Sequence, residues 1–287
     1  MINIGGTAHS LLLVFFATSS NDFSIIQEKQ QPTLISNKIM TDERTEKINQ
    51  DVITNLRSLG MEKKELKRHS NLRRASILIP LFERSHIHNN NNNNIDDDVI
   101  SDNNRNNTDE SSSSFPSSNI HVLFTQRVSN MTSHGGEVCC PGGRQDIEDC
   151  HDDVQTALRE AFEEVGLQHQ HIECIARMES VESKHSLCVT PIIGLIHPPS
   201  NAEPSELKLN AKEVEVAFAV PLHYFANPKN CHSVEKYKWK GGNVLIRTYM
   251  YNDFESGRQF KIWGLTAHVI HAVAQVAFGN KIKSDSD

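Results

Sequence analysis

The sequence is poor in several features that would place a protein in a specialised class. Hydrophobic residues make up only 37 % of the 287 residues, so part of the chain is expected to lie outside a packed core. The six cysteines are scattered, and none of them forms a Cys-x-x-Cys pair. This usage favours a reducing compartment over a disulfide framework or a structural zinc site.

Positive charge is also scarce, and the formal net charge is -7. Such a chain has no bulk attraction for nucleic acid phosphates, so a non-specific nucleic acid binder is disfavoured. The N-terminal apolar run at residues 11–17 is far too short to span a bilayer, and no stable membrane insertion is expected. No Lys or Arg precedes this run and no arginine precedes Arg44, which disfavours a secretory signal and a mitochondrial presequence.

The first 40 residues show no sustained period and are expected to be a disordered or targeting-like extension, with Met40 as an alternative start. Residues 41–280 are predicted to form one domain, and residues 281–287 a disordered tail. Within the domain, an amphipathic helix is predicted from Thr41 and is expected to end near Gly60. Its apolar residues recur at helical spacing: Ile48, Val52, Ile53, Leu56 and Leu59.

A low-complexity segment of Asn, Asp and Ser covers residues 85–118. It cannot bury enough apolar surface to fold, so it is predicted to be a disordered insertion. The apolar runs on either side, residues 75–82 and 120–127, are predicted to be neighbouring strands that this loop connects. A linker between two domains is the weaker alternative, because the preceding piece is too small for its own core.

The remaining pattern contains more strands than helices. Strands are expected at residues 187–196, 214–221 and 243–251, with residues 260–263 pairing to the last of these. Helices are expected at about 152–165, with Gly166 as C-cap, and at about 265–278. Because strands and helices are not regularly interleaved, the pattern predicts an α+β layered fold rather than a doubly wound one.

Three carboxylates fall on one face of the helix predicted at 152–165. At about 100° per residue, Glu160, Glu163 and Glu164 lie within one arc of about 100°. The apolar stripe on the opposite side can dock on a sheet. From the helix alone, a solvated acidic face is the ordinary explanation. The functional alternative is that Mg²⁺ or Mn²⁺ holds these oxygen ligands together.

The surroundings of this helix favour the functional alternative. Gly142-Gly143 leads through an acidic loop to Arg159-Glu160, then Glu163-Glu164, then Gly166-Leu167. The second half resembles the box of the Nudix hydrolase family, whose form there is Arg-Glu-apolar-x-Glu-Glu-x-Gly-apolar. In the first half, the family has a glutamate five residues after the glycine and seven residues before the arginine.

This chain departs from the box in its first half. Asp149 stands where the family has the glutamate, and nine residues rather than seven separate it from Arg159. The extra residues are expected to lie in the loop before the helix. In the family the residue at this position pairs with the box arginine. Here Asp149 is the candidate partner of Arg159, and Asp146 and Glu148 are the alternatives.

A second resemblance lies upstream and concerns the coenzyme A diphosphatases of the same family. Leu123-Phe124-Thr125-Gln126-Arg127 and Gly136 through Pro141-Gly142-Gly143 match their element with the family's spacing. Three positions depart from the pattern: Val128 replaces a serine, Thr132 an arginine and Cys140 a phenylalanine. Shorter stretches as far as Ala274 are also similar to that subfamily.

The resemblance implies a Nudix fold, a mixed β-sheet layered between helices. It implies metal-dependent hydrolysis of coenzyme A or acyl-CoA to 3′,5′-ADP and (acyl-)4′-phosphopantetheine. The metal ligands would be Glu160, Glu163 and Glu164, with Glu163, Glu164 and Arg159 as catalytic candidates. On the substrate side it implies Arg127, Gly142 and Gly143, and it gives Asp149 and Gly166 structural roles. The general base is left open between these glutamates and a carboxylate from a later loop.

Two other functions remain open. One is a Nudix hydrolase of another nucleoside diphosphate derivative, such as ADP-ribose or NADH; the other is a non-catalytic Nudix binding module. Cys150-His151 fits no zinc spacing, and His268 and His271 are expected to be packing residues. The sequence assigns no oligomeric state. Cytoplasm is the default location, and the resemblance adds mitochondrion or peroxisome.

Overall fold

The computed structural model describes residues 32–62, 72–84, 118–131, 134–184, 186–240 and 242–279, with side chains from Glu43 onward. The chain divides into two compact units, residues 1–39 and 40–287. The sheets and the candidate site belong to the second unit. The expected extension up to residue 31 and the expected tail lie outside the described residues.

A mixed sheet forms the centre of this unit. Within the described residues it has eight strands, with β1 and β7 parallel at its centre and the remaining pairs antiparallel. Its strands are β1 (Arg73–Glu83), β2 (Ile120–Arg127), β3 (Val138–Cys139), β4 (Gly142–Arg144), β5 (Ile172–Arg177), β6 (Val181–Glu182), β7 (Leu187–Ile196) and β8 (Val214–Pro221).

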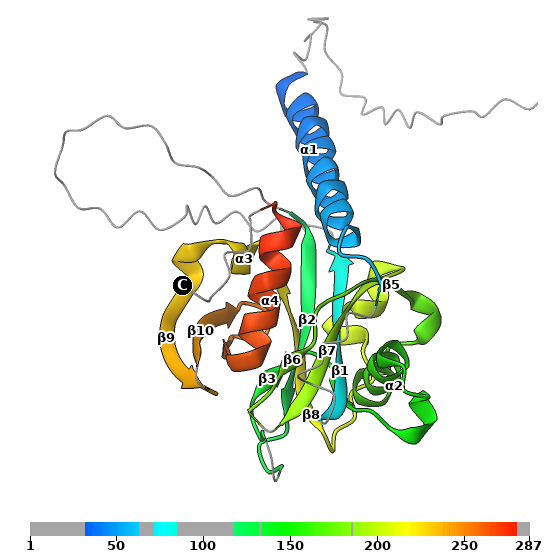
Figure 1. Cartoon of the computed structure of the whole chain (residues 1–287). Helices are drawn as coiled ribbons and strands as arrows, with labels where there is room; N and C mark the ends of the chain where they lie inside the picture. Colours follow the sequence, from blue (N-terminus) through cyan, green and yellow to red (C-terminus); the bar gives the residue numbers. More distant parts are fainter. Residues whose placement is uncertain are drawn as a thin grey trace, which may run out of the picture. The chain divides into compact units, whose positions relative to one another are not determined.

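Helices cover both faces of this sheet. Alternate side chains of β1 point to opposite faces: Leu78 packs in the cluster that contains α2 (Asp153–Val165), and Ile79 in the cluster that contains α4 (Gly264–Ala277). Figure 1 shows α2 and α4 on opposite sides of the strands. Each such fully buried aliphatic side chain contributes about 1.5–3 kcal/mol. The predicted α+β fold, a mixed sheet layered between helices, is confirmed.

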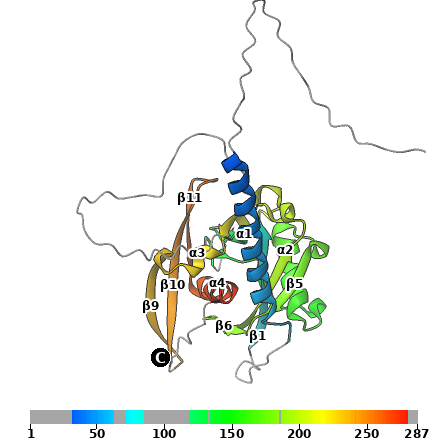
Figure 2. The ribbon, with the colours of Figure 1, turned by 90° about the horizontal axis from the view of Figure 1, so that it is seen from above.

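A second sheet packs on the outer side of α4. It contains three strands within the described residues: β9 (Cys231–Trp239), β10 (Gly242–Asp253) and β11 (Arg258–Trp263), in the order β11-β10-β9. Figure 2 shows α4 between this sheet and the central one. The short helix α3 (His223–Ala226) follows β8. The predicted pairing of residues 243–251 with 260–263 is confirmed.

The first helix differs from its prediction at both ends. Helix α1 spans Pro32–Arg57, so Thr41 does not start it, and it ends three residues before Gly60. A proline is tolerated in the first turn of a helix because its missing N–H has no partner there. The predicted apolar stripe is confirmed, since Val52 and Leu56 are buried. None of the helices in the described part of the chain is long and apolar enough to cross a membrane.

The predicted insertion joins strands that are indeed neighbours, because β1 and β2 pair with Glu83 opposite Ile120. Residues 85–117 lie outside the described residues. Residue 118, which was expected to be the last residue of the insertion, belongs to the described fold. Ser118 is buried, and its hydroxyl donates to the Asn49 side chain at 2.8 Å.

Candidate functional site

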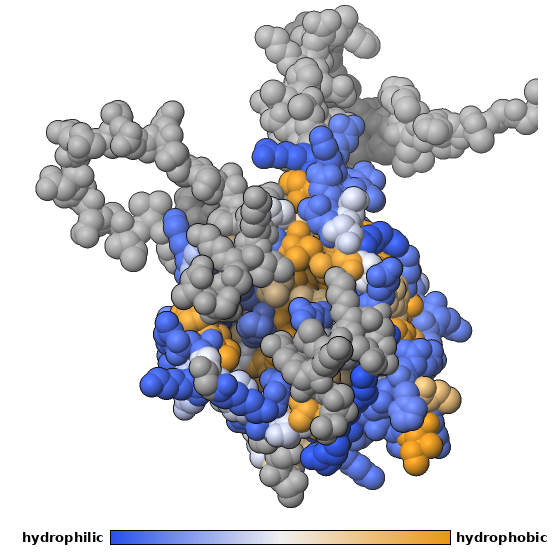
Figure 3. Space-filling model, in the orientation of Figure 1, coloured by the Kyte–Doolittle hydropathy of each residue, from blue (hydrophilic) through white to orange (hydrophobic). Residues whose placement is uncertain are grey.

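Helix α2 carries the candidate site, and its boundaries follow from its caps. The Asp152 side chain accepts a hydrogen bond from the Val154 N–H at 2.8 Å, and Gly166 ends the helix in the left-handed conformation at a φ of 75°. This confirms Gly166 as the C-cap. The helix starts after Cys150 and His151, so the extra residues of the box lie in the loop before it, as predicted. The solvent face around α2 is largely hydrophilic (right-hand side of Figure 3).

The three glutamates of α2 differ in burial. The side chain of Glu163 is 50 % exposed, that of Glu160 15 % and that of Glu164 only 2 %. Burial raises the pKa of Glu164 to about 7, although the neighbouring Arg127 lowers it. Burial also raises the pKa of Glu160. A solvated acidic face therefore describes Glu163 alone, and Glu160 and Glu164 are charges withdrawn from water.

Gly142 and Gly143 lie directly beside these carboxylates. They belong to β4, which pairs with β1, so these two glycines form a strand and not a turn. The Gly142 N–H donates to Glu164 Oε2 at 3.3 Å. A Cβ on Gly142 would overlap the Ser76 carbonyl, and one on Gly143 would overlap the Glu160 carboxylate. The glycines are needed for close approach and not for a bend.

This geometry separates the effects of two alanine substitutions. Gly142→Ala places its Cβ against rigid backbone and is expected to destabilise the fold by about 1–3 kcal/mol. Gly143→Ala meets only the end of the Glu160 side chain, which can move. We expect it to lower activity and leave the unfolding temperature nearly unchanged. Thermal unfolding and turnover of both variants test this, and equal destabilisation of the two would contradict it.

Arg159 connects the glutamates to the loop before α2. Its Nε and Nη2 donate to the two oxygens of Asp149 at 2.9 and 3.0 Å, and its Nη1 lies 3.0 Å from Glu160 and 3.0 Å from Glu163. Bidentate bonding fixes the guanidinium plane. The Arg159 hydrogen bonds lower the pKa of buried Asp149 to about 2, and they raise that of Arg159.

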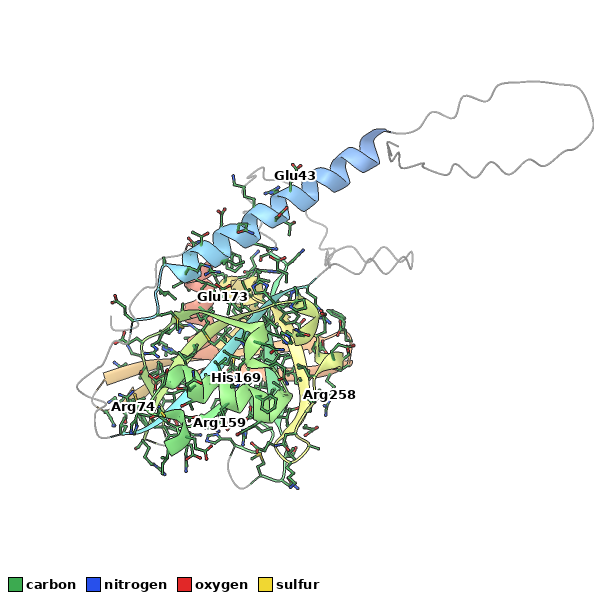
Figure 4. The ribbon with its side chains drawn as sticks, turned by 90° about the vertical axis from the view of Figure 1, so that its right-hand side faces the viewer. Glu43, Arg74, Arg159, His169, Glu173 and Arg258 are labelled. Atoms are coloured by element: carbon green, nitrogen blue, oxygen red, sulfur yellow. The ribbon has the colours of Figure 1, made fainter. Side chains whose placement is uncertain are left out.

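The question of the arginine's partner is thus answered by the contacts. Asp149 makes the pair despite the longer spacer, while the Asp146 side chain accepts from the Ile147 N–H at 2.6 Å. Glu148 is exposed, and among the described residues its side chain has no recorded contact with Arg159. Figure 4 shows Arg159 at the lower edge of the domain.

Arg127 stands at the end of β2 and faces the most buried glutamate. Its Nη1 lies 3.3 Å from Glu164 Oε1, and its side chain is 19 % exposed. The upstream element, through Arg127, and helix α2, through Glu164, are therefore in contact, which residues of one site must be. This contact occupies one edge of the guanidinium, and the role of Arg127 toward a substrate stays a prediction.

Sequence reasoning did not single out Glu213, which adjoins the cluster. Its negative charge raises the pKa of both Glu160 and Glu164. The loop that carries it is fixed to α2, because the Asn210 N–H donates to the Glu164 carbonyl at 2.9 Å. The Asn210 side chain also donates to Glu213 Oε1 at 3.4 Å. A glutamate directly before a predicted strand is a signal too common to have identified it.

Divalent cations suit this donor set, although the side chains are not arranged as a closed metal site. Among the described residues, no three His, Cys, Asp or Glu side chains converge to hold an ion as they lie, and Glu163 is turned toward Arg159. Two buried carboxylates, each raising the other's electrostatic cost, are stabilised by a bound cation. Glu160, Glu163 and Glu164 thus fit Mg²⁺ or Mn²⁺ by chemistry.

The structure places two of the histidines that the sequence analysis considered. His271 on α4 hydrogen-bonds to the hydroxyl of buried Tyr249 at 2.9 Å, a packing role as expected. His151 belongs to no metal cluster within the described part of the chain.

Comparison with known proteins identifies relatives of this chain. No family model matches the chain. It is 37 % identical over 161 residues to Nudix hydrolase 15, mitochondrial, of Arabidopsis thaliana, which covers 56 % of this chain and 54 % of that protein. It is 34 % identical over 157 residues to peroxisomal coenzyme A diphosphatase NUDT7 of Mus musculus, covering 55 % and 64 %. The chain thus spans between half and two thirds of the length of these curated relatives.

Solved structures add little to this. The Nudix hydrolase RenU from M. smegmatis is matched at 17 % identity and a TM-score of 0.35, over 54 % of this chain and 73 % of that one. The compartments in the relatives' names differ, mitochondrion and peroxisome, so they assign none here. A bacterial relative from Photorhabdus laumondii, the Nudix hydrolase NudL, is 35 % identical over 154 residues, which are 54 % of this chain and 75 % of that protein. With this identity and coverage, the chain belongs to the Nudix hydrolase family.

Proposed function

We propose that this protein is a metal-dependent diphosphatase that hydrolyses coenzyme A or acyl-CoA to 3′,5′-ADP and (acyl-)4′-phosphopantetheine. The observation that carries the proposal is the contact of Arg127 with Glu164 at 3.3 Å, which joins the element resembling coenzyme A diphosphatases to the Nudix helix. The similarity to a relative named as a coenzyme A diphosphatase supports the same substrate.

The residues of the site have different proposed roles. Glu160, Glu163 and Glu164 would hold Mg²⁺ or Mn²⁺, which when bound neutralises phosphate charge and lowers the pKa of a water. Arg159 positions Glu160 and Glu163 by ion pairing, and Asp149 fixes Arg159 in turn. Glu213 approaches the cluster from a second loop and is the proposed proton acceptor for the attacking water.

Product analysis tests the proposal. The purified chain is incubated with coenzyme A, ADP-ribose or NADH, each with Mg²⁺ or Mn²⁺ and again with chelator, and the products are separated by chromatography. We expect metal-dependent formation of 3′,5′-ADP from coenzyme A and little product from the others. Preferred cleavage of ADP-ribose or NADH would keep the diphosphatase chemistry and overturn the substrate. Folded, cation-binding protein that cleaves nothing would favour a binding module.

A further inference from the structure

A cavity of about 330 Å³ opens beside the catalytic helix at the start of β1. Its size falls within the range of small-molecule sites. Three elements supply its walls: the start of β1, the end of β4 and the turn before α2. The lining residues are Leu72, Arg73, Arg74, Arg144, Gln145 and His151.

Strand pairing brings the arginines of this cavity together. β1 and β4 are antiparallel with Ala75 opposite Arg144, and the Gln145 N–H donates to the Arg74 carbonyl at 3.0 Å. Alternation along β1 therefore places Arg73 on the face of the sheet that Arg144 shares, and Arg74 on the opposite face, where it pairs with Asp153 of α2. Backbone bonding, and not flexible loops, sets the positions of these charges.

The cavity is cationic in an acidic protein. Three arginines and no Asp or Glu are among its lining residues, whereas the chain carries a net charge of -7. The nearby acid is Asp153, whose Oδ1 lies 3.6 Å from Arg74. Like charges gathered at one place repel, and a bound anion removes this repulsion.

Hydrogen-bond donors in the cavity exceed acceptors. Arg73 and Arg144 are exposed, and within the described residues neither side chain has a hydrogen bond or ion pair. Guanidinium donors match the oxygens of a phosphate group.

The lengthened spacer of the Nudix box forms one wall. Cys150 and His151 both adopt positive φ angles, 50° and 59°, a region that residues other than glycine rarely occupy. This turn places His151 on the cavity. Strained residues of this kind persist where the surrounding structure holds them, often at binding sites.

We propose that this cavity binds a phosphate-type anion at a site separate from the glutamate cluster. The absence of a carboxylate among its lining residues sets it apart from a cation site. The Arg144 carbonyl accepts from Arg159 Nη2 at 3.0 Å, so the bound anion adjoins the residue that positions Glu160 and Glu163. Figure 4 labels both Arg74 and Arg159 in the lower part of the domain.

Binding of inorganic phosphate to the full chain, without substrate or metal, tests the proposal. Titration is followed by calorimetry at constant ionic strength, with chloride as the reference anion. The double variant Arg73→Gln/Arg144→Gln is expected to bind phosphate at least about 10-fold more weakly. Arg258→Gln is the control: it also removes an arginine charge, from the ion pair with Glu215. This variant is expected to bind phosphate as tightly as the wild type does.

Two outcomes would overturn the site: no phosphate binding by folded wild-type protein, or equal binding by wild type and double variant. A second measurement identifies the source of the anion. A higher KM of the double variant for coenzyme A, but not for dephospho-coenzyme A, assigns the cavity to the substrate's own phosphate. Unchanged KM for both, with phosphate binding lost, assigns it to free phosphate. The calorimetric result stands even if neither compound is a substrate.

Discussion

Replacing Glu164 by glutamine is expected to lower kcat by at least about 100-fold, since even residues that only orient metal ligands cost 10–100-fold. The substitution removes a charge from a metal ligand and keeps its shape. Glu163→Gln is expected to have a similar effect on turnover from its exposed position. Initial rates with the substrate identified by product analysis measure both effects, and the exposed Glu206 supplies the control variant, Glu206→Gln.

The same variant separates loss of function from loss of fold. The pKa of Glu164 is raised from 4.5 to about 7 in the folded state. A carboxyl group whose pKa is raised by folding makes the folded protein less stable as the pH rises from 4.5 through 7. At pH 8 the ionised Glu164 therefore destabilises the metal-free protein. Glu164→Gln lacks this cost and should unfold in chelator at a temperature no lower than the wild type. Wild-type turnover in both glutamine variants would remove these residues from the reaction.

Replacing Arg159 by methionine is expected to destabilise the protein by about 3–5 kcal/mol, the usual cost of leaving a buried charge unpaired. Asp149 is only 3 % exposed, and both of its carboxylate oxygens accept from Arg159. Chemical denaturation at neutral pH measures the loss. Activity should fall as well, because Glu160 and Glu163 lose the group that positions them.

The pH dependence of this loss identifies its cause. The pKa of Asp149 is lowered from 3.8 to about 2 in the folded state, so the pair stabilises the fold above about pH 4 and ceases to do so as pH falls through 2. The difference in the free energy of unfolding between the wild type and Arg159→Met should therefore become smaller in acid. The double variant Asp149→Asn/Arg159→Met should recover much of the stability. A double variant as unstable as the single one would contradict the ion-pair explanation.

The elements that sequence reasoning located well are those with strong apolar patterns. β2, β7 and β8 have the predicted bounds, because most of their side chains are buried and form apolar runs. β9 was missed because most of its side chains are exposed, so its hydrophobicity does not alternate. β4 was missed because glycines favour a turn locally, and its pairing with β1 is decided by distant residues.

The candidate site shows the same division. Helical spacing was sufficient to group Glu160, Glu163 and Glu164, since one local element carries all three. It did not indicate that Glu164 is almost fully buried, because Arg127 and Gly142 from other strands enclose it. The approach of Glu213 depends on a loop fixed to α2 from more than 40 residues away. Such contacts follow from the assembled sheet and not from any local pattern.

Manganese binding is the most direct measurement of the central claim that the carboxylates of α2 form a divalent cation site. Free Mn²⁺ is monitored by electron paramagnetic resonance during titration of the folded chain and of its Glu160→Gln and Glu164→Gln variants. Saturable binding by the wild type, with clear loss in both variants, is the predicted result. Folded wild-type protein that leaves Mn²⁺ free, or variants that bind it as tightly as the wild type, would contradict the claim.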